Sequence, residues 1–412
     1  MNVPNNAANG AEKIDYTGLG LACAGGVVEG AIYEIGALNA LQDAIIGLDL
    51  NQMSTYVGIS SGALLTSCLA NGVTARSLSK AVVGHADEAE LNFEPNTLFG
   101  FAVDEYLDRL SNIPKAVWKS VEYLFQHPTQ WSLWGSLGGF GRVIPAGIFD
   151  NKNLEKYLRF IFSKVGRSND FRKIKAKLRI VATNLDTAEL VSFGEEGYDD
   201  IPISVAVQAS TALPGLYTPI KIGQKYYIDG VARRTVHASA ALKEGVKLLF
   251  CINPIVPINT RAGEVGGQGK HLNDYGLPAV MSQTFRVLVF SRMQTGFERY
   301  KMFYPDADTL LIEPRMDDDE VFFSNIFSFS NRHKVAEHAY QKTRTFLREN
   351  AETIQPKLAK HGLRLDLEGL EKPRSLFNEH DIHQGSGLFE EAQSAFDKLN
   401  IAIRQFRQTV GA

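Results

Sequence analysis

The fold of this chain is decided by residues 55–62, which have the sequence TYVGISSG. The first three residues are β-branched or aromatic and favour a strand, and the other five form a GxSxG turn in which Gly58 and Gly62 flank Ser60. A mostly apolar stretch follows that can continue as a buried helix. Strand, sharp turn and helix make the nucleophile elbow of serine hydrolases, where glycines make room for a strained serine. The pattern predicts Ser60, rather than Ser61, as a nucleophile, although the same letters also occur in plain turns.

The same order of strand, glycine turn and helix occurs once before. An apolar run at residues 19–24 leads into residues 25–30, GGVVEG, and apolar residues then recur at helical spacing. Backbone N–H groups of such a loop can stabilise the oxyanion of ester hydrolysis. A phosphate-binding loop is disfavoured because the chain has no GxxxxGK[ST] and no GxGxxG with a matching acidic residue. A tight turn in which Glu29 only favours the helix N-terminus stays open as the alternative.

Repeated strand-turn-helix units imply parallel strands joined by crossover helices. Further strands are expected at residues 178–182, 190–193, 225–228, 247–251 and 309–312, and helices at residues 278–297 and 332–348. We therefore predict an α/β fold with three layers, in which helices cover both faces of a mostly parallel central sheet.

The third motif is Asp229-Gly230, which ends the apolar strand at residues 225–228. Catalytic carboxylates often sit at such strand ends in α/β sheets, although Asp-Gly is also a common turn dipeptide. With an ordinary pKa near 3.9, an aspartate must be partly desolvated to accept a serine proton.

Together, the three motifs make the chain resemble the patatin-like phospholipases from about residue 16 to about residue 242. Residues 182–185, 189–193 and 209–215 also match the family's sequence pattern. The resemblance implies a lipid acyl hydrolase with a Ser-Asp dyad and no cofactor or metal. The residues it assigns are Ser60 as nucleophile, Asp229 as base, Gly25, Gly26, Val27 and Gly30 as the oxyanion loop, and Gly58, Gly62 and Gly230 as motif glycines.

Three positions depart from the family pattern. Val27 stands where a third glycine is usual, Glu29 where a basic residue is usual, and Val231 where another small residue is usual. None of them removes a catalytic side chain. Glu29 adds a negative charge at the expected mouth of the site, where it should disfavour anionic head groups.

Two alternatives follow from the same residues. In a Ser-His-Asp hydrolase, His237 would follow Asp229 in the required chain order, and His271 and His333 are further candidates without a motif. The departures at Val27 and Glu29 instead motivate a non-catalytic effector on the same fold. A further possibility is a regulated enzyme whose C-terminal apolar stripe recruits a partner.

The expected organisation is a flexible lead at residues 1–15, a catalytic domain at 16–349 and a helical extension at 350–412. Within the domain, residues 93–149 form an aromatic insertion that carries Trp118, Trp131 and Trp134. It is either a lipid-facing lid or a helical subdomain with inward aromatics. The extension ends in a helix whose apolar stripe is expected to dock on the domain or on a protein partner; its members are Leu388, Ala392, Phe396, Leu399, Ile403 and Phe406.

Composition sets the remaining limits. The 412 residues include 44% hydrophobic and 22% charged side chains, which is ordinary globular usage and excludes disordered, collagen-like and disulfide-framework classes. The net charge of −3 provides no positive field for nucleic acid. Cys23, Cys68 and Cys251 are scattered and odd in number, which indicates reduced thiols. With no signal peptide and no membrane-spanning run in evidence, we expect a cytoplasmic protein that reaches its lipid substrate at a membrane surface.

Overall fold

The computed structural model describes residues 14–84, 147–260, 271–318 and 332–377, and residues 86, 88, 91, 92, 100 and 101. The strands of the main sheet are β1 (Leu19–Cys23), β3 (Thr55–Ile59), β6 (Lys177–Asn184), β7 (Leu190–Phe193), β9 (Ile220–Ile222), β10 (Lys225–Asp229), β11 (Leu248–Ile252) and β12 (Asp308–Ile312). The helices are α1 (Val27–Ala44), α2 (Ser61–Ala70), α3 (Ala75–Val82), α7 (Lys152–Phe162), α8 (Ile203–Ser210), α9 (Ala238–Lys243), α10 (Gly276–Phe303), α12 (Arg332–Glu349), α13 (Ala351–Ala359) and α14 (Leu367–Glu371).

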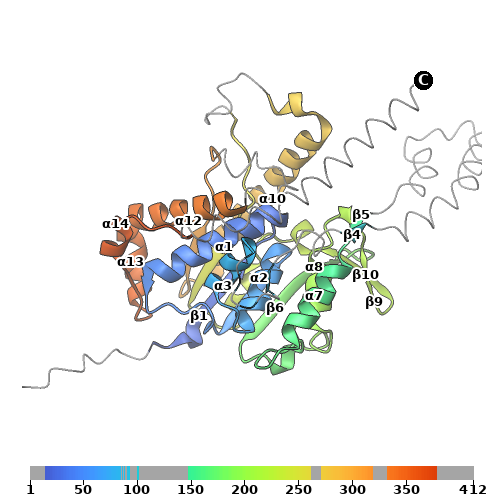
Figure 1. Cartoon of the computed structure of the whole chain (residues 1–412), viewed down its shortest axis with the longest axis horizontal. Coiled ribbons are helices and arrows are strands. Elements are labelled where there is room, and N and C mark those ends of the chain that lie inside the picture. The colour runs from blue at the N-terminus through green and yellow to red at the C-terminus, as the bar shows by residue number, and fades with distance from the viewer. Residues whose placement is uncertain are drawn as a thin grey trace, which may run out of the picture.

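The predicted α/β class is confirmed. The sheet has the order β12-β11-β1-β3-β6-β10-β9, with β7 paired to β6, and helices surround it (Figure 1). From β12 to β6 every pairing is parallel, whereas β7, β10 and β9 are antiparallel to their neighbours. All residues of β1, β3 and β11 are buried, as expected for parallel strands covered on both faces.

The connections place helices on both sides of the sheet. The steps from β1 to β3 and from β3 to β6 run in one direction, and right-handed crossovers put α1 and α2 on one face. The helix α9 contacts β1, β3 and β11 from the other face, on which a Cβ on Gly20 would meet the side chain of Val246, just after α9, at 3.0 Å. The helix α12 lies on α1 so closely that a Cβ on Gly36 would be 2.3 Å from the carbonyl oxygen of Ala336.

Residues 351–377 pack on this body. The short strand β13 (Arg364–Leu365) pairs with β2 (Ile45–Ile46), and Leu358, Leu363 and Leu376 belong to the same buried core as the sheet. Over its described part, the expected extension thus begins with elements that share the domain's core.

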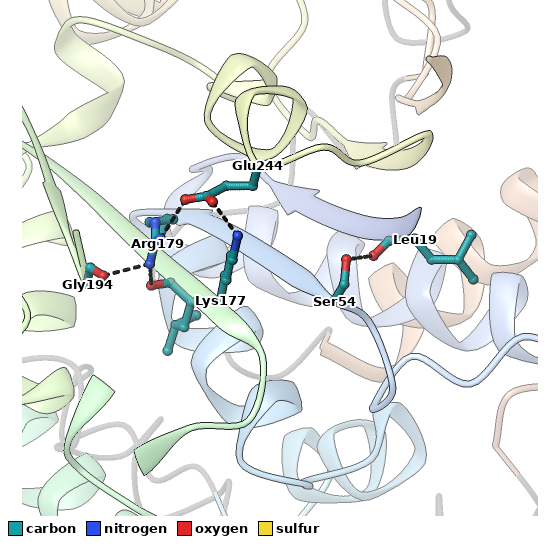
Figure 2. A network of polar contacts seen from close by, with 7 residues as sticks. Leu19, Ser54, Lys177, Arg179, Gly194 and Glu244 are labelled. Atoms are coloured by element: carbon teal, nitrogen blue, oxygen red, sulfur yellow. Dashed lines mark hydrogen bonds and ion pairs between the residues drawn. The ribbon is translucent and has the colours of Figure 1, made fainter. Parts of the chain in front are cut away.

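A network of polar contacts joins the starts of the parallel strands, at the end of the sheet opposite Ser60 (Figure 2). Glu244, just after α9, accepts from Lys177 at 2.7 Å and from Arg179 at 2.6 Å, and Arg179 also donates to the carbonyl oxygen of Gly194 at 2.6 Å. The Ser54 hydroxyl donates to the carbonyl oxygen of Leu19 at 2.8 Å. These contacts fix β6 to α9 and β3 to β1.

Candidate active site

Ser60 lies in a sharp turn between β3 and α2. Its backbone has φ 53° and ψ −123°, a strained conformation for a residue with a side chain, and the residue is 5% exposed. Both flanking glycines are required by close approach. A Cβ on Gly58 would lie 2.2 Å from Thr66 Oγ1, and one on Gly62 would lie 2.3 Å from the carbonyl oxygen of Cys23. The GxSxG turn thus has the geometry of a nucleophile elbow.

The register on β6 brings Asp229 to Ser60. Ile59, the last residue of β3, pairs with Val181, and the next residue of β6, Ala182, pairs with Asp229. Along one edge of β6, residues 180–183 pair with β7. On the opposite edge β6 pairs first with β3 and then, directly beyond the last pair with β3, with β10. The two strands run toward each other and end at the same place. In agreement, a Cβ on Gly230 would meet the side chain of Ile59 at 3.3 Å.

Asp229 is buried, with 1% of its surface exposed. Burial raises the pKa of its carboxyl to about 7, although the nearby Ser60 side chain and the hydrogen bond from the Val231 N–H work in the opposite direction. Oδ1 accepts from Val231 N–H at 2.9 Å, whereas Oδ2 has no partner of full hydrogen-bond geometry within the described residues. The carboxyl therefore interacts with Ser60 and can hold or release a proton near neutral pH.

The segment from Ser210 to Leu213 ties these two residues together. Ser60 N–H donates to Ser210 Oγ at 2.8 Å, Ser210 Oγ donates to the carbonyl oxygen of Val181 at 2.6 Å, and Asp229 N–H donates to the carbonyl oxygen of Ala212 at 3.0 Å. In the sequence, residues 209–215 were noted only because they match the pattern of the patatin-like phospholipases. The hydrogen bonds that connect them to Ser60 and Asp229 are visible only in the fold.

The glycine loop lies directly beside Ser60. A Cβ on Gly25 would be 2.7 Å from Ser60 Cβ, and one on Gly26 would be 2.6 Å from the Pro254 ring. Among the described residues, the N–H groups of Gly25, Gly26 and Val27 donate to no protein acceptor, whereas the N–H of Gly30, also predicted for the oxyanion loop, donates to the carbonyl oxygen of Gly26 at 2.8 Å. They lie at the N-terminus of α1, whose dipole favours negative charge. Val27 has φ 55°, so this branched residue adopts the left-handed backbone that its glycine counterpart would tolerate more easily.

An apolar pocket opens over Ser60. It encloses about 730 Å³ of space not occupied by atoms, its open mouth included, and Arg332 is the charged residue among its lining. The other lining residues are Val27, Val28, Ala31, Ile32, Ile35, Ser60, Ser61, Leu64, Leu65, Val82, Leu154, Thr211, Leu213 and Tyr217. The mostly apolar lining suits a hydrocarbon chain.

Glu34 is a buried acid that the sequence did not indicate. It has no exposed surface, Ser61 Oγ donates to its Oε2 at 3.4 Å, and burial raises its pKa well above the usual range. A neutral carboxyl is therefore expected behind the elbow at pH 7. The helical spacing of α1 gave no signal for it, because one polar residue among apolar ones looks like an ordinary surface position.

Glu29 is half-buried. Burial raises its pKa to about 7, and the nearby positive charge of Arg286 on α10 lowers it in part. Arg286 in turn donates to the carbonyl oxygen of Val256 at 3.2 Å. The negative charge expected at the mouth of the site is thus partly neutralised.

The candidate histidines lie away from Ser60. His237 has a left-handed backbone, lines a separate small pocket with Arg234 and Arg292, and has a pKa lowered to about 4 by burial and then by Arg234 and Lys243. His271 precedes α10 on the surface, and His333 is half-buried on α12. None of the three lines the pocket over Ser60.

Two predicted features, the aromatic lid and the C-terminal docking helix, fall on residues that the structure does not describe. Trp118, Trp131, Trp134 and the C-terminal stripe from Leu388 to Phe406 lie outside the described residues, so the lid and the docking helix stay predictions. The described ends of the insertion, β4 (Gly100–Phe101) and β5 (Gly147–Asp150), pair with each other. β5 also pairs with β8 (Gly215–Tyr217), whose last residue lines the pocket. Across the described ranges, no group of acidic, histidine or cysteine side chains could hold a metal, and no helix is long and apolar enough to span a bilayer.

Comparison with known proteins identifies the family. The model of the patatin-like phospholipases matches residues 21–242, which is more than half of the chain. The chain belongs to the patatin-like phospholipase family. The matched part of the chain contains the glycine loop, the GxSxG turn and Asp229.

The individual proteins that resemble this chain are distant from it in sequence. A probable lipid hydrolase, 463L of invertebrate iridescent virus 6, is 24% identical over 216 residues, which cover 51% of this chain and 58% of that protein. VipD from Legionella pneumophila has a TM-score of 0.34 and 16% identity, with 82% of this chain and 67% of VipD covered. The type III effector ExoU has a TM-score of 0.28 and 17% identity, with 96% of this chain and 67% of ExoU covered.

Proposed function

We propose that this protein is a lipid acyl hydrolase in which Ser60 is the nucleophile and Asp229 the general base. The observation that carries the proposal is the register on β6, which ends β3 and β10 at the same place and leaves a buried carboxyl beside a strained serine. Family membership and the viral relative called a probable lipid hydrolase support the same substrate class. The apolar pocket over Ser60 supports an acyl chain as the bound part of the substrate.

The reaction has two steps. Ser60 Oγ attacks the ester carbonyl carbon while its proton passes to the Asp229 carboxylate, and the N–H groups of Gly25, Gly26 and Val27 stabilise the oxyanion. The ester C–O bond then breaks, and the leaving alcohol takes the proton from Asp229. Water attacks the acyl-enzyme, gives a proton to Asp229, and releases the fatty acid as that proton returns to Ser60. The raised pKa of Asp229 suits it to both directions of transfer.

The test combines covalent labelling with fatty-acid release. A fluorophosphonate probe should label wild-type protein and Ser61→Ala, but should not label Ser60→Ala, and only the first two should release fatty acid from mixed phospholipid and glyceride micelles. Ser61→Ala is the matched control because it removes a neighbouring hydroxyl from the same pocket.

Failure would have a defined meaning. If Ser60 is not labelled and no lipid in a broad panel is cleaved, the hydrolase proposal is wrong and a non-catalytic effector takes its place. Activity lost in His237→Ala but kept in Asp229→Asn would replace the dyad with a Ser-His arrangement.

A further inference from the structure

The helix α10 uses only one side to pack on the domain. On its inward side Val289, Phe290 and Met293 are buried, and Gln283 bonds both backbone groups of Ile258 at 2.8 and 3.0 Å. The outward side exposes large apolar residues, with exposed fractions between 36% and 72%. This apolar row consists of Leu277, Val280, Met281, Phe285, Val287 and Leu288.

The apolar row is uncharged along its whole length. Arg286 is the one charged residue between 276 and 291, and it points inward to the carbonyl oxygen of Val256. At 1.5 Å per residue these positions cover roughly 24 Å of helix. A helix that is apolar all round is ordinarily buried in protein or in lipid, and here one side has the protein while the other is exposed.

The apolar row lies near the rim of the candidate active site. The Pro254 ring sits against Gly26 and Gly30 of the glycine loop, and the residues just beyond it, Val256 and Ile258, are held by α10. Figure 1 shows α10 extending from the body of the domain beyond α1 and α12. A surface that contacts the row would therefore lie near the loop beside Ser60.

Positive charge borders one end of the apolar row. Arg233 and Arg234 are exposed after β10, and Arg292, one turn beyond Leu288, donates to the carbonyl oxygen of Ala232 at 2.8 Å. Arg234 and Arg292 also line one small pocket together. Apolar side chains followed by arginines match the depth profile of a bilayer surface, where hydrocarbon gives way to phosphate.

We propose that the apolar row and these three arginines form a docking face for the surface of a phospholipid bilayer. The row enters the boundary of the acyl region, the arginines meet lipid phosphates, and the glycine loop is held near the ester groups of the lipid. This assignment rests on the proposed function for its purpose, but binding to a bilayer can be measured without turnover. Recognition by a protein is less well matched, because a protein interface would normally have a polar rim all around an apolar centre, whereas the arginines border this row at one end only.

Vesicle flotation of the full chain tests the face. The Ser60→Ala background removes turnover, so the result does not depend on catalysis. With vesicles of phosphatidylcholine and about 30% phosphatidylglycerol, Leu277→Asp/Met281→Asp should lower the bound fraction about tenfold, and Arg233→Gln/Arg234→Gln should remove the salt-dependent part of binding. Phe160→Asp/Val165→Asp is the matched control, because these two apolar residues are 49% and 105% exposed but lie outside the apolar row. This control variant should bind vesicles as well as the Ser60→Ala protein does.

A fluorophore distinguishes lipid from other occupants. The chain's three cysteines are buried, so Met281→Cys supplies an accessible thiol for an environment-sensitive dye, and Val165→Cys supplies the control site. The dye at position 281 should shift to the blue with vesicles and be quenched by nitroxide-labelled lipid, and the dye at 165 should do neither. A blue-shifted dye before vesicles are added, unchanged by them, would overturn the proposal in favour of coverage by this chain or a second copy. Unchanged flotation of the aspartate variant would also overturn it, whatever the outcome of Ser60 labelling.

Discussion

The two ends of the central sheet differ in how their polar side chains are paired and in how strained the backbone is. At the strand starts, Glu244, Lys177 and Arg179 form short ion pairs, and the nearby positive φ angles, at Gly194 and Gly245, fall on glycines, which tolerate them. At the strand ends, Ser60 adopts a strained backbone, and the buried acid Asp229 has an oxygen without a full hydrogen bond. Paired charges stabilise a fold, whereas a strained residue beside a desolvated acid costs stability and persists where chemistry requires it. The difference supports the proposal that the functional site lies at the C-terminal end of the parallel strands.

The largest effect is expected for Asp229→Asn, which removes the buried acid from the C-terminal end of the sheet. We expect fatty-acid release to fall by about 10⁴-fold or more, because the general base is removed. At pH 8 the variant should have a larger free energy of unfolding than the wild type. The folded pKa of Asp229, about 7, lies above its ordinary 3.8, so its buried charge costs the wild-type protein up to about 4 kcal/mol at that pH. This cost falls as the pH drops below 7 and disappears below the unfolded pKa. Chemical denaturation at pH 8 and pH 4 checks the sign, and a variant that is less stable at pH 8 contradicts it.

Gly25→Ala tests the loop beside the nucleophile. The new Cβ would lie 2.7 Å from Ser60 Cβ, so the loop must shift and its N–H groups should leave the oxyanion position. We expect kcat to fall about 10² to 10³-fold, as when an oxyanion donor is lost. Gly18→Ala, before the start of β1, is the matched control because its Cβ would meet Lys247 side-chain atoms at an ordinary 3.5 Å. Equal losses in both variants would argue against a special role for the loop.

The pH profile tests the raised pKa of Asp229. The base must be charged to accept the Ser60 proton, so kcat/KM should rise with pH to a plateau above about pH 7. At pH 5 the activity should be roughly 100-fold below the plateau. A soluble short-chain ester is the right substrate, because it separates the titration of Asp229 from binding to vesicles. A midpoint near pH 4 would mean that the carboxyl is not desolvated as the fold indicates.

The sequence predicted the parts that local patterns encode. Apolar runs and glycine turns located the main strands, and the motifs singled out Ser60 and Asp229 before any geometry was available. It could not predict the hydrogen bond from Ser60 to Ser210, because that contact joins residues 150 positions apart. Nor could spacing tell which side of α10 packs on the domain, since apolar residues occur all around its first half. The polar composition after residue 350 suggested an appendage, yet β13 pairs with β2, more than 300 residues earlier in the chain.

The smallest expected effect lies at the other end of the sheet. Glu244 is partly buried, which raises its pKa, but hydrogen bonds from Lys177 and Arg179 outweigh burial and leave the pKa below its ordinary value. Its stabilising contribution is therefore present above the unfolded pKa and is lost as the pH falls through the folded one. We expect Glu244→Gln to cost about 1 kcal/mol of unfolding free energy at pH 7, less at pH 3, and to leave kcat/KM unchanged. Chemical denaturation and ester kinetics measure the two effects separately. A large loss of activity with little loss of stability would contradict the division of labour between the two ends of the sheet.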